Sequence, residues 1–207
     1  IDDLPKLSDL PENVTIKPDV SWSGNNIFCL RRGENLLDHK NWNRERIISQ
    51  IKNDNFLSER KPIFFAEELL TPEYGSGDHG LPRDYKFFCF GEKIALVHCV
   101  LRNSNVEKNL NVHHYLDHQF KPIKGKVMES REVPDEPFPF PDCWDEMVDA
   151  AKRLGKSVDC FMRVDLYATE NGAVFGEFTP TPEGGKGFTP WADRYLATFW
   201  RGKEGAS

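Results

Sequence analysis

The sequence predicts an α+β fold of two lobes, each built on a mostly antiparallel sheet. β-type runs follow one another in hairpin order instead of alternating regularly with helices, which argues against a parallel sheet. Segments with helical spacing are few and stand between groups of strands. The 207 residues are 39% hydrophobic and include 15 Phe and 5 Trp, which is enough apolar material for one large core or two smaller ones.

The smaller lobe is assigned to residues 1–66. A strand at 14–18 (VTIKP) ends at proline, and a turn rich in Gly, Ser and Asn joins it to a second strand at 26–32 (NIFCLRR). Apolar residues at helical spacing predict a helix over 42–52. A strand at 63–70 (IFFAEELL) then leads into the joint between the lobes.

The larger lobe is assigned to residues 67–207 and is expected to hold four strands and two helices. The strands are expected at 84–90, 93–102, 160–167 and 173–178, and the helices at 143–154 and 190–199. Gly91 and Glu92 supply the turn of the first hairpin, and Asp142 is expected to cap the first helix. Residues 103–140 are expected to be irregular, because prolines crowd their end.

Composition excludes several classes of function. A net charge of −6 without a basic stripe argues against binding of nucleic acid. No apolar run reaches the roughly 18–20 residues that span a bilayer, and no signal-peptide pattern is visible. The five cysteines are scattered and lack a CxxC pair, which is typical of reduced thiols in a cytoplasmic protein.

Three charged residues stand in strands that otherwise read as buried. Asp165 and Glu177 flank a turn at Glu170–Gly172, so a hairpin would bring both carboxylates to one face. Arg163 has the same parity as Asp165 and projects to that face. Hard oxygen ligands beside a guanidinium suit Mg²⁺ and a transferring phosphoryl or acyl phosphate group. The alternative is a salt-bridge cluster that only ties the strands together.

Lys17 is a candidate phosphate ligand. It ends an apolar strand and is followed at once by DVSWSGNN, whose small residues allow backbone N–H groups to point into a common anion site. The alternative is a plain hairpin turn with a solvated lysine.

The stretch Glu67–Leu70 stands at the expected joint, where free backbone groups can bind an adenine edge. Asp84 and Lys86 share one face of the next strand, where the carboxylate can accept hydrogen bonds from ribose and the lysine can reach phosphate. The alternative for each of these residues, and most of all for Glu68, is an exposed surface position that binds no ligand.

The segment VHHYLDH offers a competing metal site. If it were helical, His114 and His118 would be four residues apart beside Asp117, which is a partial zinc site. No third ligand is evident in the sequence, so a polar loop or surface turn is the favoured interpretation.

Taken in order, TIKP with its SWSGNN loop, AEELL, DYKFFCFGEK, RVDLY and FGEFTPTPEGGKGFTP resemble the ATP-grasp superfamily. The sequences of the last three segments are most similar to the TupA-like ATP-grasp proteins of bacterial polysaccharide and teichuronopeptide synthesis. The resemblance extends from about Leu10 to Phe199. It implies two lobes that clamp ATP between them, and an upstream domain that this chain is expected to lack.

The resemblance also implies a role for each matching residue. Arg163 and Lys86 would be catalytic, and Asp165, Glu177 and Thr179 would bind Mg²⁺. Relatives usually carry asparagine at the position of Thr179, which is a weaker donor. The residues expected to bind ATP are Lys17, Ser21, Ser23 and Gly24 for the phosphates, Glu67, Glu68, Leu69 and Leu70 for adenine, and Asp84 for ribose.

The implied activity is ATP-dependent ligation of a carboxylate to an amine through an acyl phosphate. The cofactors would be ATP and Mg²⁺, and the substrates would be sugar- or amino-acid-linked. Two alternatives remain open: a kinase of the same superfamily that phosphorylates a sugar or small molecule, and a non-catalytic nucleotide-binding module.

Overall fold

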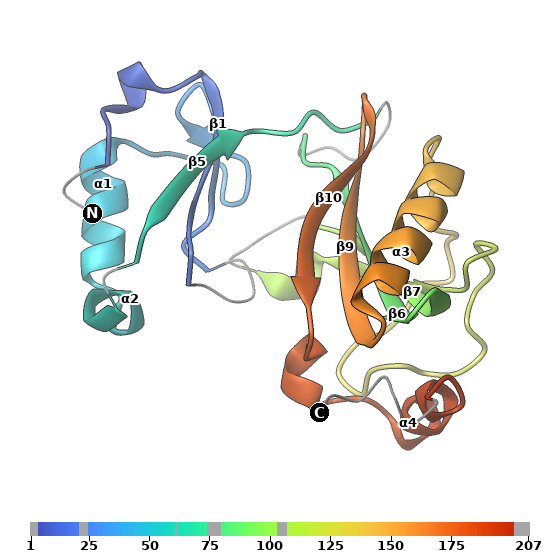
Figure 1. Ribbon diagram of the computed structural model, residues 1–207. Helices are drawn as coiled ribbons and strands as arrows, with labels where there is room; N and C mark the ends of the chain where they lie inside the picture. The colour runs from blue at the N-terminus through green and yellow to red at the C-terminus, as the bar shows by residue number, and fades with distance from the viewer. Residues whose placement is uncertain (1–3, 21–24, 61, 74–79, 103–106, 201–207) are drawn as a thin grey trace. The chain divides into compact units, whose positions relative to one another are not determined.

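The computed structural model describes residues 4–20, 25–60, 62–73, 80–102 and 107–200 (Figure 1). It confirms an α+β fold with two antiparallel five-stranded sheets. The chain divides into two compact units, and the continuous N-terminal part of the first extends to Leu70. Residues 80–81 and 107–110 also belong to the first unit, and the second contains most of the remaining chain.

The first unit is a sheet with the strand order β4-β3-β2-β1-β5 and two helices. Its strands are β1 (Asn13–Pro18), β2 (Phe28–Arg31), β3 (Glu34–Asn35), β4 (Lys40–Asn41) and β5 (Phe64–Glu68), and its helices are α1 (Arg44–Lys52) and α2 (Asn55–Arg60). A 3-10 turn at Leu7–Asp9 precedes β1. The expected strands at 14–18, 26–32 and 63–70 and the helix over 42–52 are confirmed, with shifted ends.

Alternation in β1 separates the two faces of this sheet. Val14 and Ile16 are buried in a core with Ile47 and Ile51 of α1, whereas Lys17 projects to the other face. The helix begins where expected for its sequence, because the Asn43 side chain accepts a hydrogen bond from a backbone N–H of the first turn. The face opposite the helices is therefore free to carry polar side chains.

The second unit has the strand order β10-β9-β6-β7-β8. Its strands are β6 (Arg83–Phe90), β7 (Lys93–Leu101), β8 (Val112–Leu116), β9 (Phe161–Thr169) and β10 (Gly172–Thr179), and its helices are α3 (Trp144–Val158) and α4 (Pro190–Ala197). Short 3-10 turns lie at Lys108–Leu110, which belongs to the first unit, and at Pro182–Gly185.

The two faces of the second sheet are covered differently. Helix α3 packs Met147 and Ala151 onto one face, against Phe87 and Leu166, and Figure 1 shows it alongside the sheet. On the other face, Phe88, Leu96 and Tyr115 pack in a smaller cluster with Val127, Met128 and Ala192. Next to that cluster the same face carries charged residues.

Two sequence-based expectations are wrong in this unit: the irregular structure of the whole region 103–140, with a polar loop or turn at VHHYLDH, and the Asp142 cap. Strand β8 lies within the region expected to be irregular, because VHHYL pairs with β7. His114 therefore belongs to a strand, which also removes the helix that the competing zinc site needed. Asp142 does not cap α3: the N-cap is Cys143, without a side-chain hydrogen bond, and the Asp142 N–H donates to Glu73.

The short elements α2, β3 and β4 were not predicted from the sequence. All five cysteines are free. Within the described parts of the chain, none of the helices combines the length and apolar character needed to cross a bilayer.

Candidate active site

The hairpin of β9 and β10 places two carboxylates opposite each other. Asp165 and Glu177 are direct cross-strand partners, so their side chains lie on one face of the sheet. The tight turn alone would not give this pairing. Residues 172–175 pair in a register that would set Gly176 against Asp165, but the register shifts by one residue before Glu177.

Gly176 is the extra residue of this β-bulge. A Cβ atom at this position would lie 2.8 Å from Cε2 of Tyr167 and 3.2 Å from the backbone oxygen of Asp165. Only glycine fits here without displacing a neighbour. The bulge on edge strand β10 thus re-aims Glu177 toward Asp165, a known use of bulges beside functional sites.

Arg163 connects the two carboxylates. Its Nε donates to Oδ1 of Asp165 at 2.7 Å, and its Nη2 donates to Oδ2 at 2.7 Å. The same Nη2 lies 3.3 Å from Oε1 of Glu177 and 2.9 Å from Oγ1 of Thr179. The Thr179 hydroxyl also donates to Glu177 at 3.1 Å, so four predicted site residues meet at one point.

Strand β6 extends this charged cluster. Lys86 Nζ lies 2.6 Å from Oδ2 of Asp165 and 2.7 Å from Oδ2 of Asp84. Arg102 reaches the same Asp84 oxygen at 3.3 Å. Acids and bases therefore alternate from Arg102 to Glu177, and this alternation balances their charges. Arg102 was missed by sequence reasoning because a basic residue at the end of a strand carries no distinctive pattern.

The two acids that share Lys86 titrate differently. Burial raises the pKa of Asp165, and repulsion from Asp84 adds to the rise against the attraction of Lys86 and Arg163. Burial also acts to raise the pKa of Asp84, but Lys86 and Arg102 outweigh it and the pKa is lowered. The pair thus keeps its negative charge most firmly on Asp84.

The oxygen donors at this point fit Mg²⁺. Each carboxylate oxygen has two lone pairs. Oδ2 of Asp165 accepts from both Arg163 and Lys86, whereas Oδ1 accepts one bond, from Arg163, among the described residues. Oδ1 of Asp165 and the carboxylate of Glu177 can therefore still coordinate an ion. Glu177 stands on the edge strand with its side chain 65% exposed, and it can turn toward an ion at little cost. Mg²⁺ prefers such oxygens and keeps several waters. Thr179 would add a hydroxyl oxygen, which is a weaker donor than an asparagine carbonyl.

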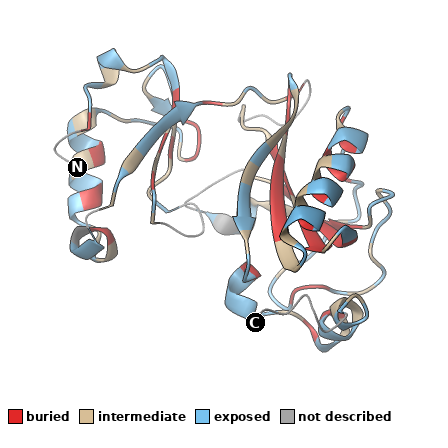
Figure 2. Cartoon of the chain, in the orientation of Figure 1, coloured by how far each residue is buried: buried red, intermediate tan, exposed pale blue. Residues whose placement is uncertain are grey.

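Figure 2 shows how burial changes across this hairpin: β9 is largely buried, whereas the residues of β10 are all partly or fully exposed. The Oδ1 atom of Asp84 is buried and has no hydrogen-bond partner among the described residues. An acceptor in this state needs a donor, which a ribose hydroxyl or a water could supply.

The first unit holds a simpler arrangement. Lys17 Nζ lies 2.7 Å from Oε2 of Glu67, and the two side chains are 36% and 49% exposed. Both residues lie on the sheet face opposite α1, because β1 and β5 pair with Thr15 against Glu67. The residue expected to bind phosphate therefore lies beside one expected near adenine.

The other residues predicted to bind ATP show no side-chain arrangement, among the described residues, that points to a nucleotide. Glu68 is exposed at the end of β5, and Leu69 is buried with its N–H 3.5 Å from the Asn13 carbonyl. Leu70 is partly buried. The expected covering-loop residues Ser21, Ser23 and Gly24 lie outside the described residues.

The described residues contain no cluster of three or more His, Cys, Asp or Glu side chains suited to a metal ion. The zinc alternative loses its helix, since His114 packs in β8 against Phe138 with ring centroids 5.2 Å apart. His118 lies in the turn that follows. The Mg²⁺ interpretation needs only two carboxylates, because water and phosphate complete the coordination sphere of this ion.

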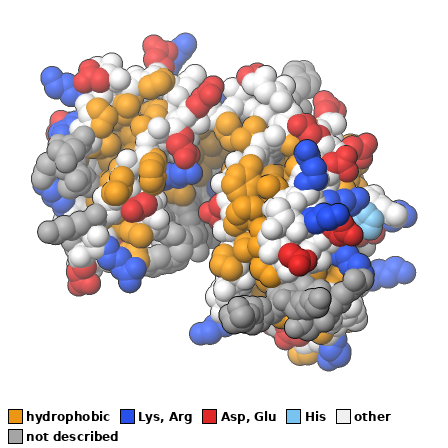
Figure 3. Space-filling model, in the orientation of Figure 1, with side chains coloured by type: hydrophobic (Ala, Val, Ile, Leu, Met, Phe, Trp, Pro, Cys, Tyr) orange, Lys and Arg blue, Asp and Glu red, His pale blue; other side chains and the backbone are white. Residues whose placement is uncertain are grey.

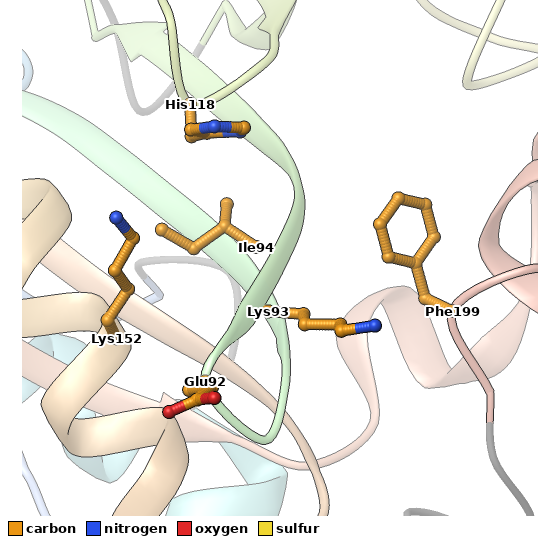
Figure 4. A pocket seen from close by; sticks show the side chains of 6 residues that line it. All are labelled: Glu92, Lys93, Ile94, His118, Lys152 and Phe199. Atoms are coloured by element: carbon orange, nitrogen blue, oxygen red, sulfur yellow. The ribbon is translucent and has the colours of Figure 1, made fainter.

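Two other surface features lie apart from the charged cluster. An apolar patch in Figure 3 lies over β10, where Phe175 and Phe178 are 47% and 40% exposed. Their cross-strand partners face α3, so the patch is on the opposite face from Glu177. A surface hollow of about 530 Å³ (Figure 4) is bordered by Lys93, Lys152 and their neighbours, and contains none of the cluster residues.

Comparison with known protein families gives a match over most of the chain. The family described as TupA-like ATPgrasp matches residues 2–199, which is nearly the whole chain. No curated protein matches the chain.

Proposed function

The chain belongs to the TupA-like ATP-grasp family, and we propose that it is an ATP-dependent ligase that joins a carboxylate to an amine. The acid would be activated as an acyl phosphate, and ADP and phosphate would be released. The substrates would be sugar- or amino-acid-linked, as expected for synthesis of a bacterial cell-surface polysaccharide or peptide polymer.

One observation carries this proposal: a glycine bulge sets Asp165 and Glu177 opposite each other beside Arg163. A hairpin needs no bulge for stability. A sheet that is only tied together by charge also needs no exposed carboxylate on its edge strand. The local geometry is what a divalent cation with a phosphate ligand requires.

The roles of the residues follow from their contacts. Asp165 and Glu177 would hold Mg²⁺ with help from Thr179, and the bound ion would neutralise charge on the transferring phosphoryl group. Arg163 has a guanidinium fixed by Asp165 and would stabilise the negative charge of the tetrahedral intermediate. Lys86 would provide a second fixed positive charge, because Asp84 and Asp165 hold its ammonium group in place.

The nucleotide would be bound by residues with less committed partners. Lys17, with Ser21, Ser23 and Gly24, would bind the phosphates. An exposed ion pair is worth about 1 kcal/mol or less, so Lys17 can leave Glu67 for a phosphate at small cost. Adenine would bind the backbone of Glu67–Leu70, and the ribose hydroxyls would satisfy Asp84.

The test uses nucleotide binding and turnover in the same protein. The wild-type chain should melt at a higher temperature with Mg²⁺ and ATP than with either alone, because specific binding stabilises the folded state. Asp165→Asn and Glu177→Gln should lose the Mg²⁺-dependent part of this shift. Glu170→Gln is the matched control: it removes a carboxylate from the same hairpin, at an exposed position in the turn.

The products then separate the possible activities. With a panel of acids and amines, a ligase forms ADP and an acyl phosphate from ATP and the acid, and releases inorganic phosphate when an amine then attacks the acyl carbon, so both products should accumulate only when acid and amine are present together. A kinase would release ADP while the phosphate stays on the substrate. Nucleotide binding that is unaffected by Asp165→Asn and Glu177→Gln would contradict the proposed site.

A further inference from the structure

The charged cluster is one end of a longer line of side chains. Glu177 pairs with Asp165, Asp165 with Lys86, Lys86 with His98, and His98 with Tyr115. Direct partners on neighbouring strands share a face, so these five residues form a row across the whole sheet, here called the cross-sheet row. The proposed function uses only its first three members.

The far end of the row is built around two histidines. The His98 ring stacks on Tyr115 with centroids 4.7 Å apart and an interplanar angle of 15°. Its Nε2 lies 2.9 Å from Nδ1 of His113. Burial lowers the pKa of both imidazoles, with the positive charge of Arg131 as a further cause, and the pKa of His113 falls to about 4. Both rings are therefore neutral at pH 7.

Arg131 closes this end. Its Nη1 donates to the Tyr115 hydroxyl at 3.3 Å, and its Nη2 donates to Oε1 of Glu183 at 2.9 Å. The Arg131 side chain is 21% exposed and the Glu183 side chain 36% exposed. The guanidinium is therefore largely withdrawn from water, while its acidic partner stays at the surface.

Glu183 holds its place at a conformational cost. Its φ of 54° is left-handed, and Gly184 and Gly185 follow with φ of 64° and 72°. A non-glycine residue in this region costs roughly 1 kcal/mol or more and is often found at functional sites. Two residues separate the turn Pro182–Gly185 from the end of β10, so Glu183 connects the strand of Glu177 to the opposite end of the row.

The chemistry of this end is rich in donors. A guanidinium has five N–H donors, and two of them are used in bonds among the described residues. A neutral imidazole pair adds a ring N–H, and the Tyr115 hydroxyl can donate when it turns. Among the described residues, Glu183 is the carboxylate that pairs with Arg131. Because the Glu183 side chain is exposed, a carboxylate or phosphate of a ligand can replace it. Arginine is well suited to bind carboxylate or phosphate in a planar, two-point fashion.

We propose that Arg131, together with His113 and Tyr115, binds a carboxylate or phosphate group carried by the amine substrate. This inference rests on the proposed function, in which nucleotide and activated acid take the end of the row from Glu177 to Lys86. The amine then approaches from the other end. Three strand spacings separate Tyr115 from Asp165, or roughly 14 Å, so the amine and the anionic group lie far apart in the substrate, as in a peptide or a phosphorylated amino sugar, and a simple alkyl amine is not expected.

Anion binding can be measured without turnover. Histidine side-chain NMR signals of the ¹⁵N-labelled full chain would be followed during titration with sodium acetate and, separately, with sodium phosphate. Either anion should shift the His113 signals, and the anion that binds more tightly identifies the group. Arg131→Met should weaken that binding by about tenfold or more, which is the typical value of a charge-assisted contact. Arg153→Met is the control: it removes an exposed arginine from α3, on the opposite face.

Each result decides the matter. Shifts in the wild type and in Arg153→Met that are weakened in Arg131→Met support the subsite. If Arg131→Met perturbs the fold, Arg131→Lys keeps the charge and should retain a weaker response. The absence of a response in the wild type, or an equal response in Arg131→Met, overturns the inference. The Mg-ATP melting shift of the same wild-type sample reports on the proposed function separately, so either idea can fail alone.

Discussion

The two units place ion pairs of nearly equal length in very different surroundings. Lys17 and Glu67 lie 2.7 Å apart in the first unit, with side chains 36% and 49% exposed. Lys86 and Asp165 lie 2.6 Å apart in the second, with side chains 12% and 3% exposed. Distance alone therefore does not describe what a pair does. The exposed pair is free to exchange partners, whereas the buried one is fixed and keeps its charges aimed in one direction.

The largest expected effect is a difference in stability between variants of these two lysines. Lys86→Met leaves Asp84 and Asp165 buried without their shared cation, and should lower the free energy of unfolding by about 3–5 kcal/mol. Lys17→Met, at an exposed pair, should lower it by about 1 kcal/mol or less. Urea unfolding of both variants measures this. Equal losses would contradict the comparison.

Acid should weaken the second unit first. Its histidines 98, 113 and 114 all have a lowered pKa, chiefly because they are buried. Below pH 6.5 the unfolded chain takes up protons that the folded unit does not, so stability is full above this value and is lost as the pH falls toward 4. Each such histidine contributes a slope of up to about 1.4 kcal/mol per pH unit.

Hydrogen exchange measured between pH 8 and 5 should show the loss of amide protection in β7 and β8 at a higher pH than in β1 and β2. Asp165 has the opposite effect on stability: because its pKa is raised in the folded unit, it favours the folded state as the pH falls. His113→Gln isolates the histidine contribution, and it should flatten the pH dependence. A second unit whose protection does not change over this range would show that the neutral histidines do not limit its stability.

A smaller loss of stability is expected from Gly176→Ala. The new methyl group meets Tyr167 at 2.8 Å, and overpacking of this kind typically costs about 1–3 kcal/mol. Gly184→Ala is a useful companion: no atom lies within 4 Å, but its φ of 64° is strained. Both variants should be mildly destabilised in thermal melts. Only Gly176→Ala should also reduce the Mg²⁺-dependent shift, because it moves Glu177 from Asp165.

The smallest expected effect tests whether residue 179 is a Mg²⁺ ligand. Thr179→Asn supplies an amide oxygen in place of a hydroxyl and should tighten Mg²⁺ binding by about a few-fold, with little change in stability. A titration of Mg²⁺ in the presence of ATP measures it. Weaker binding in the asparagine variant would place residue 179 outside the coordination sphere.

The sequence predicted the pairing of Asp165 with Glu177, but not its cause. Their spacing in the chain suggested a hairpin with both acids on one face, and the structure has that pairing. The bulge at Gly176 could not be predicted, because a glycine in a strand is compatible with several local structures. The order of the long strands and helices was readable, since hydrophobic periodicity follows directly from burial.

Other features depended on contacts that a sequence does not display. The segment VHHYL was not recognised as a strand, because its histidines mask the alternation that burial imposes. His114 faces α3, while His113 and Tyr115 face the charged side. Arg131 gains its place only from the contacts to Tyr115 and Glu183, which are distant in sequence. Short strands such as β3 and β4 carry too few residues for any periodic signal.

We propose that Asp165 and Glu177 together hold a divalent cation that also binds ATP. A crystal structure with Mg²⁺ and a non-hydrolysable ATP analogue tests it most directly. We expect an ion with an oxygen of each carboxylate at about 2.0–2.1 Å, and with phosphate oxygens and water in the remaining positions. An ion held by phosphates and water alone, with both carboxylates still paired to Arg163, would contradict it.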